Sequence, residues 1–197
     1  MKKIILLSIL CSCSFFGCSL LGISTLENPD YEVLLTEDNN KRIELRNYSA
    51  TKLVSTSAKG EFEESSNNNF RKLFKYISGE NEKEKKISMT TPVFMSLDDS
   101  NKRQMSFVVP SENLEDTPSP SSSEVEISAF PERMVAVISF SGRWKEQSFK
   151  ENEIILRNWI LEKGFIVKSA AYAAAYDPPW AVPFLRTNEV HIAVDYQ

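Results

Sequence analysis

The chain has 197 residues, of which 42% are hydrophobic and 25% are charged, values typical of a globular protein with one domain. Its 23 Lys and Arg residues are outnumbered by 27 Asp and Glu residues, so there is no global positive charge to favour nucleic acid as a partner. The single histidine, His191, excludes metal sites built from several histidines. None of the six glycines lies in a phosphate-binding loop motif.

The N-terminus has the pattern of a secretory signal. Two lysines precede the apolar run 4–10, which is too short to span a bilayer. The segment Phe15-Phe16-Gly17-Cys18 resembles the bacterial lipobox, in which the cysteine after a small residue becomes the lipid carrier. Two alternatives stay open: a motif ending at Cys13, and a plain secretory signal with incidental cysteines.

The lipobox reading divides the chain into three parts. We expect a lipoprotein signal peptide at 1–17, a lipidated tether at 18–29 that begins with Cys18, and a single domain at 30–197. All three cysteines lie in the first 18 positions, so the domain has no thiol for disulfides or catalysis. The expected location is the bacterial cell envelope, with the protein anchored to a membrane through lipid.

The first half of the domain is expected to contain a hairpin, a third strand, a helix and two more strands. The helix is predicted over 61–78, because Phe70, Leu73, Phe74 and Ile77 recur at the spacing of one helical face. Strands are predicted at 31–37, 41–48, 50–58, 87–95 and 104–110. The charged run 80–86 is expected to be a solvated loop.

The second half repeats this order after a Pro- and Ser-rich surface link at 111–123. Its helix is predicted over 145–163, and its strands at 125–129, 134–140, 165–176 and 189–196. Gly60 and Gly79 bracket the first helix as Gly142 and Gly164 bracket the second, with offsets of 82 and 85 residues. The sequence therefore predicts an α+β fold: a distorted antiparallel β-barrel built from two pseudo-symmetric strand-helix-strand-strand repeats, with two helices packed outside.

The first helix carries the candidate binding residues. Phe70 and Phe74 lie one turn apart, beside Arg71 and Lys75. Periodicity alone favours a role for both rings in the core. The alternative is that a planar apolar ligand lies against the rings and that its carboxylates are met by Arg71 or Lys75.

Catalysis finds little support in the sequence. His191 is out of phase with Val190, Ile192 and Val194 on its strand, as expected for a surface or packing residue. Almost all of the carboxylates fall on polar helix faces or in turns, and no pair is marked out as acid and base. The proline-rich segment 176–184 is expected to form a stiff aromatic loop that either plugs an end of the barrel or lines a binding cleft.

Several motifs in order resemble the SOUL heme-binding protein family. The matching segments span about residues 30–197 and are FKYISGEN at 74–81, ISMTTPV at 87–93, FVVP at 107–110, AAYDPPW at 174–180 and RTNEV at 186–190. The resemblance implies a doubled β-barrel that binds heme or another tetrapyrrole without turnover, in an apolar cleft beside the first helix. By position it carries the pocket role to Phe70 and Phe74, and the propionate-binding role to Lys75.

Two functions follow as hypotheses. The first is a membrane-tethered SOUL-domain lipoprotein that binds heme non-covalently and acts as a carrier or buffer, not as an enzyme, without a dedicated metal ligand. The second is a structural or protein-interaction lipoprotein that keeps the fold but binds no heme. The second draws on Asn67, which stands where some heme-binding members have arginine, and on the scarcity of histidine.

Overall fold

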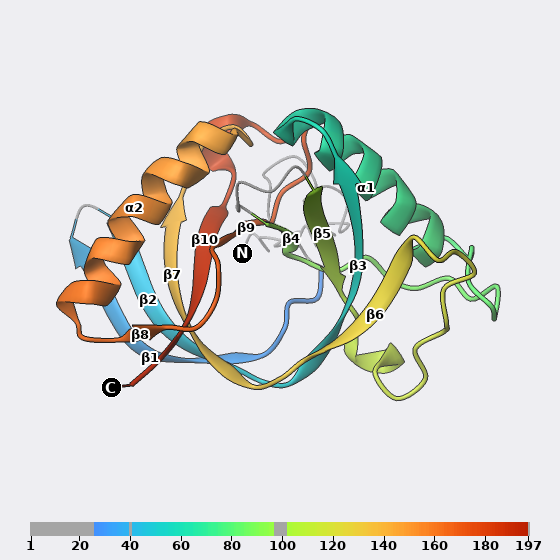
Figure 1. Ribbon diagram of the computed structural model, residues 1–197, viewed down its shortest axis with the longest axis horizontal. Helices are drawn as coiled ribbons and strands as arrows, with labels where there is room; N and C mark the ends of the chain where they lie inside the picture. Colours follow the sequence, from blue (N-terminus) through green and yellow to red (C-terminus); the bar gives the residue numbers. More distant parts are fainter. Residues whose placement is uncertain (1–25, 40, 97–101, 197) are drawn as a thin grey trace, which may run out of the picture.

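The computed structural model describes residues 26–39, 41–96 and 102–196 (Figure 1). The expected signal peptide, Cys18 and most of the expected tether lie outside these residues. The ten strands are β1 (Tyr31–Asn39), β2 (Lys41–Tyr48), β3 (Thr51–Lys59), β4 (Val93–Ser96), β5 (Lys102–Val108), β6 (Val125–Phe130), β7 (Arg133–Phe140), β8 (Ile166–Val167), β9 (Tyr172–Ala175) and β10 (Asn188–Asp195). The α-helices are α1 (Phe62–Ile77) and α2 (Glu146–Glu162), and short 3-10 turns occur at η1 (Ser111–Asn113) and η2 (Pro183–Leu185).

One antiparallel sheet contains all ten strands. Its order is β1-β2-β7-β10-β9-β4-β5-β3-β6, and β8 pairs separately with β10. The arrangement β3-β5-β4 with α1 repeats as β7-β10-β9 with α2, and the two halves meet where β4 pairs with β9. This symmetry confirms the α+β class and the doubled unit expected from the glycine spacing.

The sheet is strongly curved but open. Among the described residues, the end strands β1 and β6 pair with one neighbour each, β2 and β3, and not with each other. The predicted barrel is therefore corrected to an open curved sheet, with the helices on its outer side (Figure 1).

Each helix end lies one residue inside the range predicted from the sequence. Gly79 and Gly164 follow them with φ of 117° and 75°, a conformation that favours glycine. The strand expected at 87–95 begins only at Val93, directly after the cis Thr91–Pro92 peptide, because proline has no N–H for the ladder. The segment 165–176 forms two short strands, β8 and β9, instead of one.

The main core lies between the sheet and the two helices, and it aligns the two halves residue by residue. The buried residues of α2 correspond to buried residues of α1 at a constant offset of 83, as in Asn69 with Asn152 and Leu73 with Leu156. The same offset pairs Tyr76 with Trp159. The faces that α1 and α2 turn outward can therefore be compared position by position.

The two loops expected on the surface are partly buried. Asn81, inside the charged run 80–86, is 3% exposed, and its side-chain amide donates to the carbonyl oxygens of Tyr76 and Lys85 at 3.0 and 2.7 Å. The hydroxyl of Tyr76 donates to the carbonyl of Pro118 in the link 111–123, at 2.7 Å. These contacts pack both loops against the end of α1.

Candidate functional site

The outward face of α1 carries an exposed aromatic pair. Phe70 and Phe74 are 40% and 51% exposed, whereas Leu73 on the same helix is fully buried. Their ring centroids are 6.0 Å apart and the ring planes differ by 14°. Phe70 also makes a T-shaped contact with the buried Phe107 ring, with 5.5 Å between the ring centroids, so the pair rests on the core without belonging to it.

The equivalent positions on α2 hold a different pair. The offset of 83 places Glu153 where α1 has Phe70, and Arg157 where α1 has Phe74. The Arg157 Nε donates to Glu153 Oε1 at 2.7 Å, an ordinary i, i+4 surface ion pair. The fold therefore accommodates polar residues at this place, and the phenylalanines of α1 are not required by the architecture.

Two cations accompany the aromatic pair. The Arg71 guanidinium donates to Asn68 Oδ1 at 2.7 Å, and Lys75 Nζ lies 3.4 Å from Glu80 Oε1, with both partners of each contact near the surface. Exposed contacts of this kind contribute little stability. Both cations can therefore exchange their present partner for the carboxylate of a ligand at low cost.

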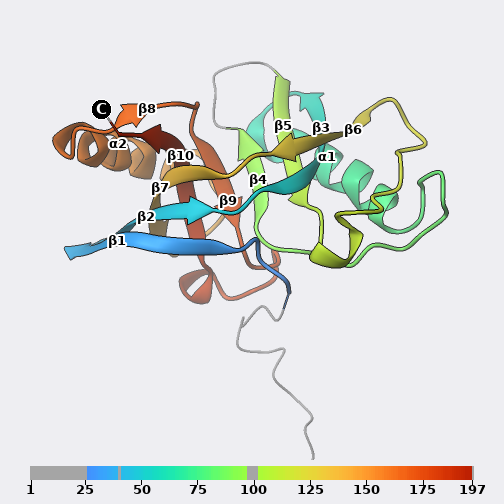
Figure 2. The ribbon, with the colours of Figure 1, turned by 90° about the horizontal axis from the view of Figure 1, so that it is seen from below.

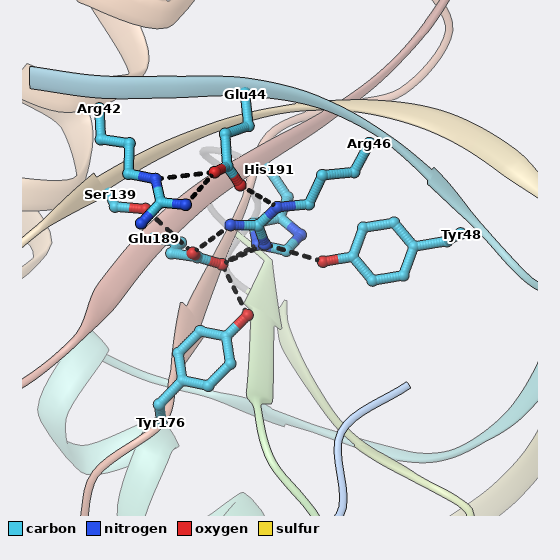
Figure 3. A network of polar contacts seen from close by, with 8 residues as sticks. All are labelled: Arg42, Glu44, Arg46, Tyr48, Ser139, Tyr176, Glu189 and His191. Carbon is cyan, nitrogen blue, oxygen red and sulfur yellow. Dashed lines mark hydrogen bonds and ion pairs between the residues drawn. The ribbon is translucent and has the colours of Figure 1, made fainter. Parts of the chain in front are cut away.

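A second group of side chains forms a buried polar network on the sheet face away from the helices (Figure 3). At its centre is the Glu189 carboxylate, which is 3% exposed. It accepts hydrogen bonds from Arg46 Nη1 and Nη2 at 3.0 and 2.8 Å, from Tyr176 at 2.6 Å and from Ser139 at 3.0 Å. The His191 ring nitrogen Nε2 lies 2.7 Å from the same carboxylate.

The neighbouring strand β2 completes the network. Arg46 Nε donates to Glu44 Oε2 at 2.7 Å, Arg46 Nη1 donates to the Tyr48 hydroxyl at 3.1 Å, and Arg42 Nε donates to Glu44 Oε1 at 2.7 Å. Side chains alternate across a strand, so Arg42, Glu44, Arg46 and Tyr48 share one face. The network thus ties together β2, β7 and β10.

Burial and pairing fix the charges in this network. Burial alone would raise the pKa of Glu189, but the hydrogen bonds from His191 and Arg46 hold it well below the usual value. Burial lowers the pKa of His191, which is fully buried, so we assign it the neutral form donating to Glu189. With its oxygens occupied by donors from four residues, Glu189 is a structural anion and not a free base.

The sequence analysis missed this network. Glu44 and Glu189 lie on strands, as predicted, but they are only 1% and 3% exposed, and their burial was not predicted. The signal was available in the alternation of residues 42–48. His191 does face away from Val190 and Ile192, as predicted, and it is a packing residue.

Neither a metal cluster nor a membrane span is found in the part of the chain that the structure describes. That part holds no group of three or more His, Cys, Asp or Glu side chains placed to bind a metal ion. Nor does it contain a helix with the length and apolar character needed to cross a membrane.

Comparison with known proteins agrees with these features. The family model described as SOUL heme-binding protein matches residues 26–193, nearly all of the described chain. The chain belongs to the SOUL heme-binding protein family. It is 34% identical to mouse heme-binding protein 2 over an alignment of 155 residues, which covers 75% of each chain. It is 28% identical over 180 residues to heme-binding protein 1 of Xenopus laevis, which covers 87% of this chain and 93% of that protein. These names describe binding proteins and not enzymes.

Some solved structures of low sequence identity share this fold. The C-terminal domain of EcmrR matches with a TM-score of 0.58 at 13% identity, over 80% of this chain and 99% of that one. A hydrolase from Listeria innocua matches with a TM-score of 0.55 at 10% identity, over 78% and 91% of the two chains. At such identities the likeness concerns the fold alone.

Proposed function

We propose that this SOUL-family protein binds heme or a related tetrapyrrole on the outward face of α1 and serves as a non-enzymatic carrier or buffer, tethered to a membrane through Cys18. The observation that carries the proposal is the exposed Phe70–Phe74 pair at positions where α2 has an ion pair. Family membership supplies the ligand class.

The chemistry of the α1 face suits a flat, apolar, dianionic ligand. Two exposed, nearly parallel rings one helical turn apart offer apolar surface that a porphyrin could contact. Arg71 and Lys75 supply cations for the two propionates through charge-assisted hydrogen bonds. The heme would contribute its own iron chemistry, and the protein's residues would contribute binding and orientation.

Axial ligation by histidine is not part of this proposal. His191 is fully buried on the opposite face of the sheet, and its Nε2 is engaged by Glu189. The retention of heme would then depend on apolar contact and propionate pairing, so we expect reversible binding.

A hemin titration followed by the Soret band tests the proposal. We expect a saturable shift for the wild-type protein. The hemin affinity of a Phe74→Asp variant should be lower by a factor of about ten or more, because one ring contact is replaced by a charge that repels propionates. Ile154→Asp is the matched control, since Ile154 is 62% exposed on α2 and its variant should titrate like the wild type.

Two outcomes would overturn the proposal. One is an unchanged spectrum at micromolar hemin, and the other is equal weakening by the Phe74 and Ile154 variants. If the spectrum is unchanged while crosslinking recovers one stoichiometric protein partner, the interaction hypothesis replaces the heme hypothesis.

A further inference from the structure

The segment between β9 and β10 exposes large apolar side chains. Trp180 and Phe184 are 83% and 74% exposed, and Val182 and Leu185 are 42% and 43% exposed. The exposure of the two rings argues against a loop that plugs one end of the fold. Residues 178–185, which we call the Trp180 loop, therefore present an apolar surface outward.

The backbone of the Trp180 loop is held in place. Arg186 Nε donates to the Ala181 carbonyl at 2.8 Å, the Thr187 amide donates to Asp177 Oδ2 at 2.6 Å, and the Gly142 amide donates to the Pro183 carbonyl at 3.0 Å. Three prolines, at 178, 179 and 183, fix further backbone angles. The apolar side chains are thus displayed by a preorganised loop, which reduces the entropy cost of docking.

The Trp180 loop lies on the side of the domain where the described chain begins. Glu27 pairs with Thr90 just before β4, and the first residue of β4, Val93, pairs with Ala175 just before the loop. Figure 2 shows the start of β1 and the orange-red turn of the loop on the same side of the molecule. The first described residue, Leu26, follows Cys18 by eight positions, a reach of at most about 28 Å.

The charges beside the loop are basic. Arg143 and Lys145 are exposed in the segment that follows Gly142, the residue bonded to Pro183. Of the nearby carboxylates, Glu146 pairs with Arg103 at 2.8 Å, while Asp177 keeps its charge and accepts from the Thr187 amide, so cations outnumber unpaired carboxylates here. Exposed aromatics flanked by cations match the boundary of an anionic lipid surface.

We propose that the Trp180 loop is a membrane-contact surface that inserts Trp180 and Phe184 at the headgroup level of an anionic bilayer. The inference rests on the membrane tethering in the proposed function, because a tether keeps the loop at high effective concentration beside the bilayer. The loop and the tether together would orient the domain relative to the bilayer.

Contact quenching of tryptophan fluorescence tests this surface. The mature full-length protein is purified from membranes of expressing cells and reconstituted into phosphatidylglycerol-containing vesicles with brominated or unbrominated acyl chains. Trp180 is the most exposed tryptophan, while Trp159 is 5% exposed, so we expect quenching by bromine in the wild type and its loss in Trp180→Ser. Phe184→Ser should also reduce the quenching, because the second inserted ring is gone.

The controls separate this proposal from the others. Leu161→Ser, at a residue of α2 that is 78% exposed, should leave the quenching unchanged. Equal wild-type emission in the two kinds of vesicle, or quenching that survives Trp180→Ser, would overturn the proposal. So would crosslinking in cells from position 184 to a protein instead of to lipid. Hemin titration without vesicles and the mass of the N-terminal peptide report separately on heme binding and lipidation.

Discussion

Transplanting the α2 ion pair onto α1 would separate the binding role of the aromatic pair from its structural role. The double variant Phe70→Glu with Phe74→Arg copies Glu153 and Arg157, which form a 2.7 Å ion pair at the equivalent place. Glu and Arg have at least the helix propensity of Phe, so the helix should persist. We expect hemin affinity to fall about 100-fold, since each lost ring contact contributes roughly 1.5 kcal/mol.

The stability cost of the same variant should be small. Phe70 is 40% exposed and loses mainly its edge contact with Phe107, whereas Phe74 is already half exposed. We estimate a loss of about 1–2 kcal/mol from reduced apolar burial, offset by about 0.3–0.5 kcal/mol from the new ion pair. Chemical denaturation measures this change in the free energy of unfolding, and Soret titration measures the affinity.

A reciprocal variant sharpens the test. Glu153→Phe with Arg157→Phe builds an aromatic pair on α2, where the positions equivalent to Arg71 and Lys75 are Ile154 and Asn158, which carry no charge. We expect no restoration of hemin binding when this pair is added to the α1 double variant. Hemin affinity that survives the first swap, or that returns fully with the second, would refute a specific site on α1.

Three further predictions concern the buried network and the N-terminus. Glu189→Ala should destabilise the protein by about 3–5 kcal/mol in chemical denaturation, because Arg46 loses one of its two carboxylate partners and the donors on Tyr176 and His191 lose their acceptor, while Glu189→Gln should cost less. His191 is neutral in the fold because burial lowers its pKa, whereas in the unfolded chain it takes up a proton below its usual pKa of 6.5. The free energy of unfolding should therefore fall by about 1.4 kcal/mol for each pH unit below 6.5. His191→Gln should remove this dependence below pH 6.5 without weakening hemin binding, and a retained slope would contradict the assignment. Globomycin should cause the uncleaved precursor to accumulate if Cys18 is lipidated, and unaltered processing would exclude that reading.

The doubled fold could be predicted because its signals are local. Helix periodicity and the glycines after each helix are read within about 20 residues, and both helices lie where these signals put them. The pairing of β4 with β9, which joins the halves, depends on contacts about 80 residues apart and carries no local signal. The sheet is open because its end strands β1 and β6 do not pair, and this also has no local signal in the sequence.

The candidate site, too, could be predicted only in part. The spacing of Phe70 and Phe74 was visible in the sequence, but their exposure was not, because one helical periodicity fits both a buried and a solvent-facing stripe. The Glu189 network joins residues 143 positions apart, as in its ion pair with Arg46. These side chains meet because β2 pairs with β7 and β7 pairs with β10, and this strand order has no local signal in the sequence.

The most direct test of the central claim maps hemin onto the protein by nuclear magnetic resonance. Ferric heme is paramagnetic and broadens the amide resonances of residues close to it. Binding at the α1 face predicts broadening centred on Phe70–Lys75, with the corresponding residues 153–158 of α2 unaffected. Broadening centred on the Glu189 network or on the Trp180 loop, or no broadening at saturating hemin, would contradict the account.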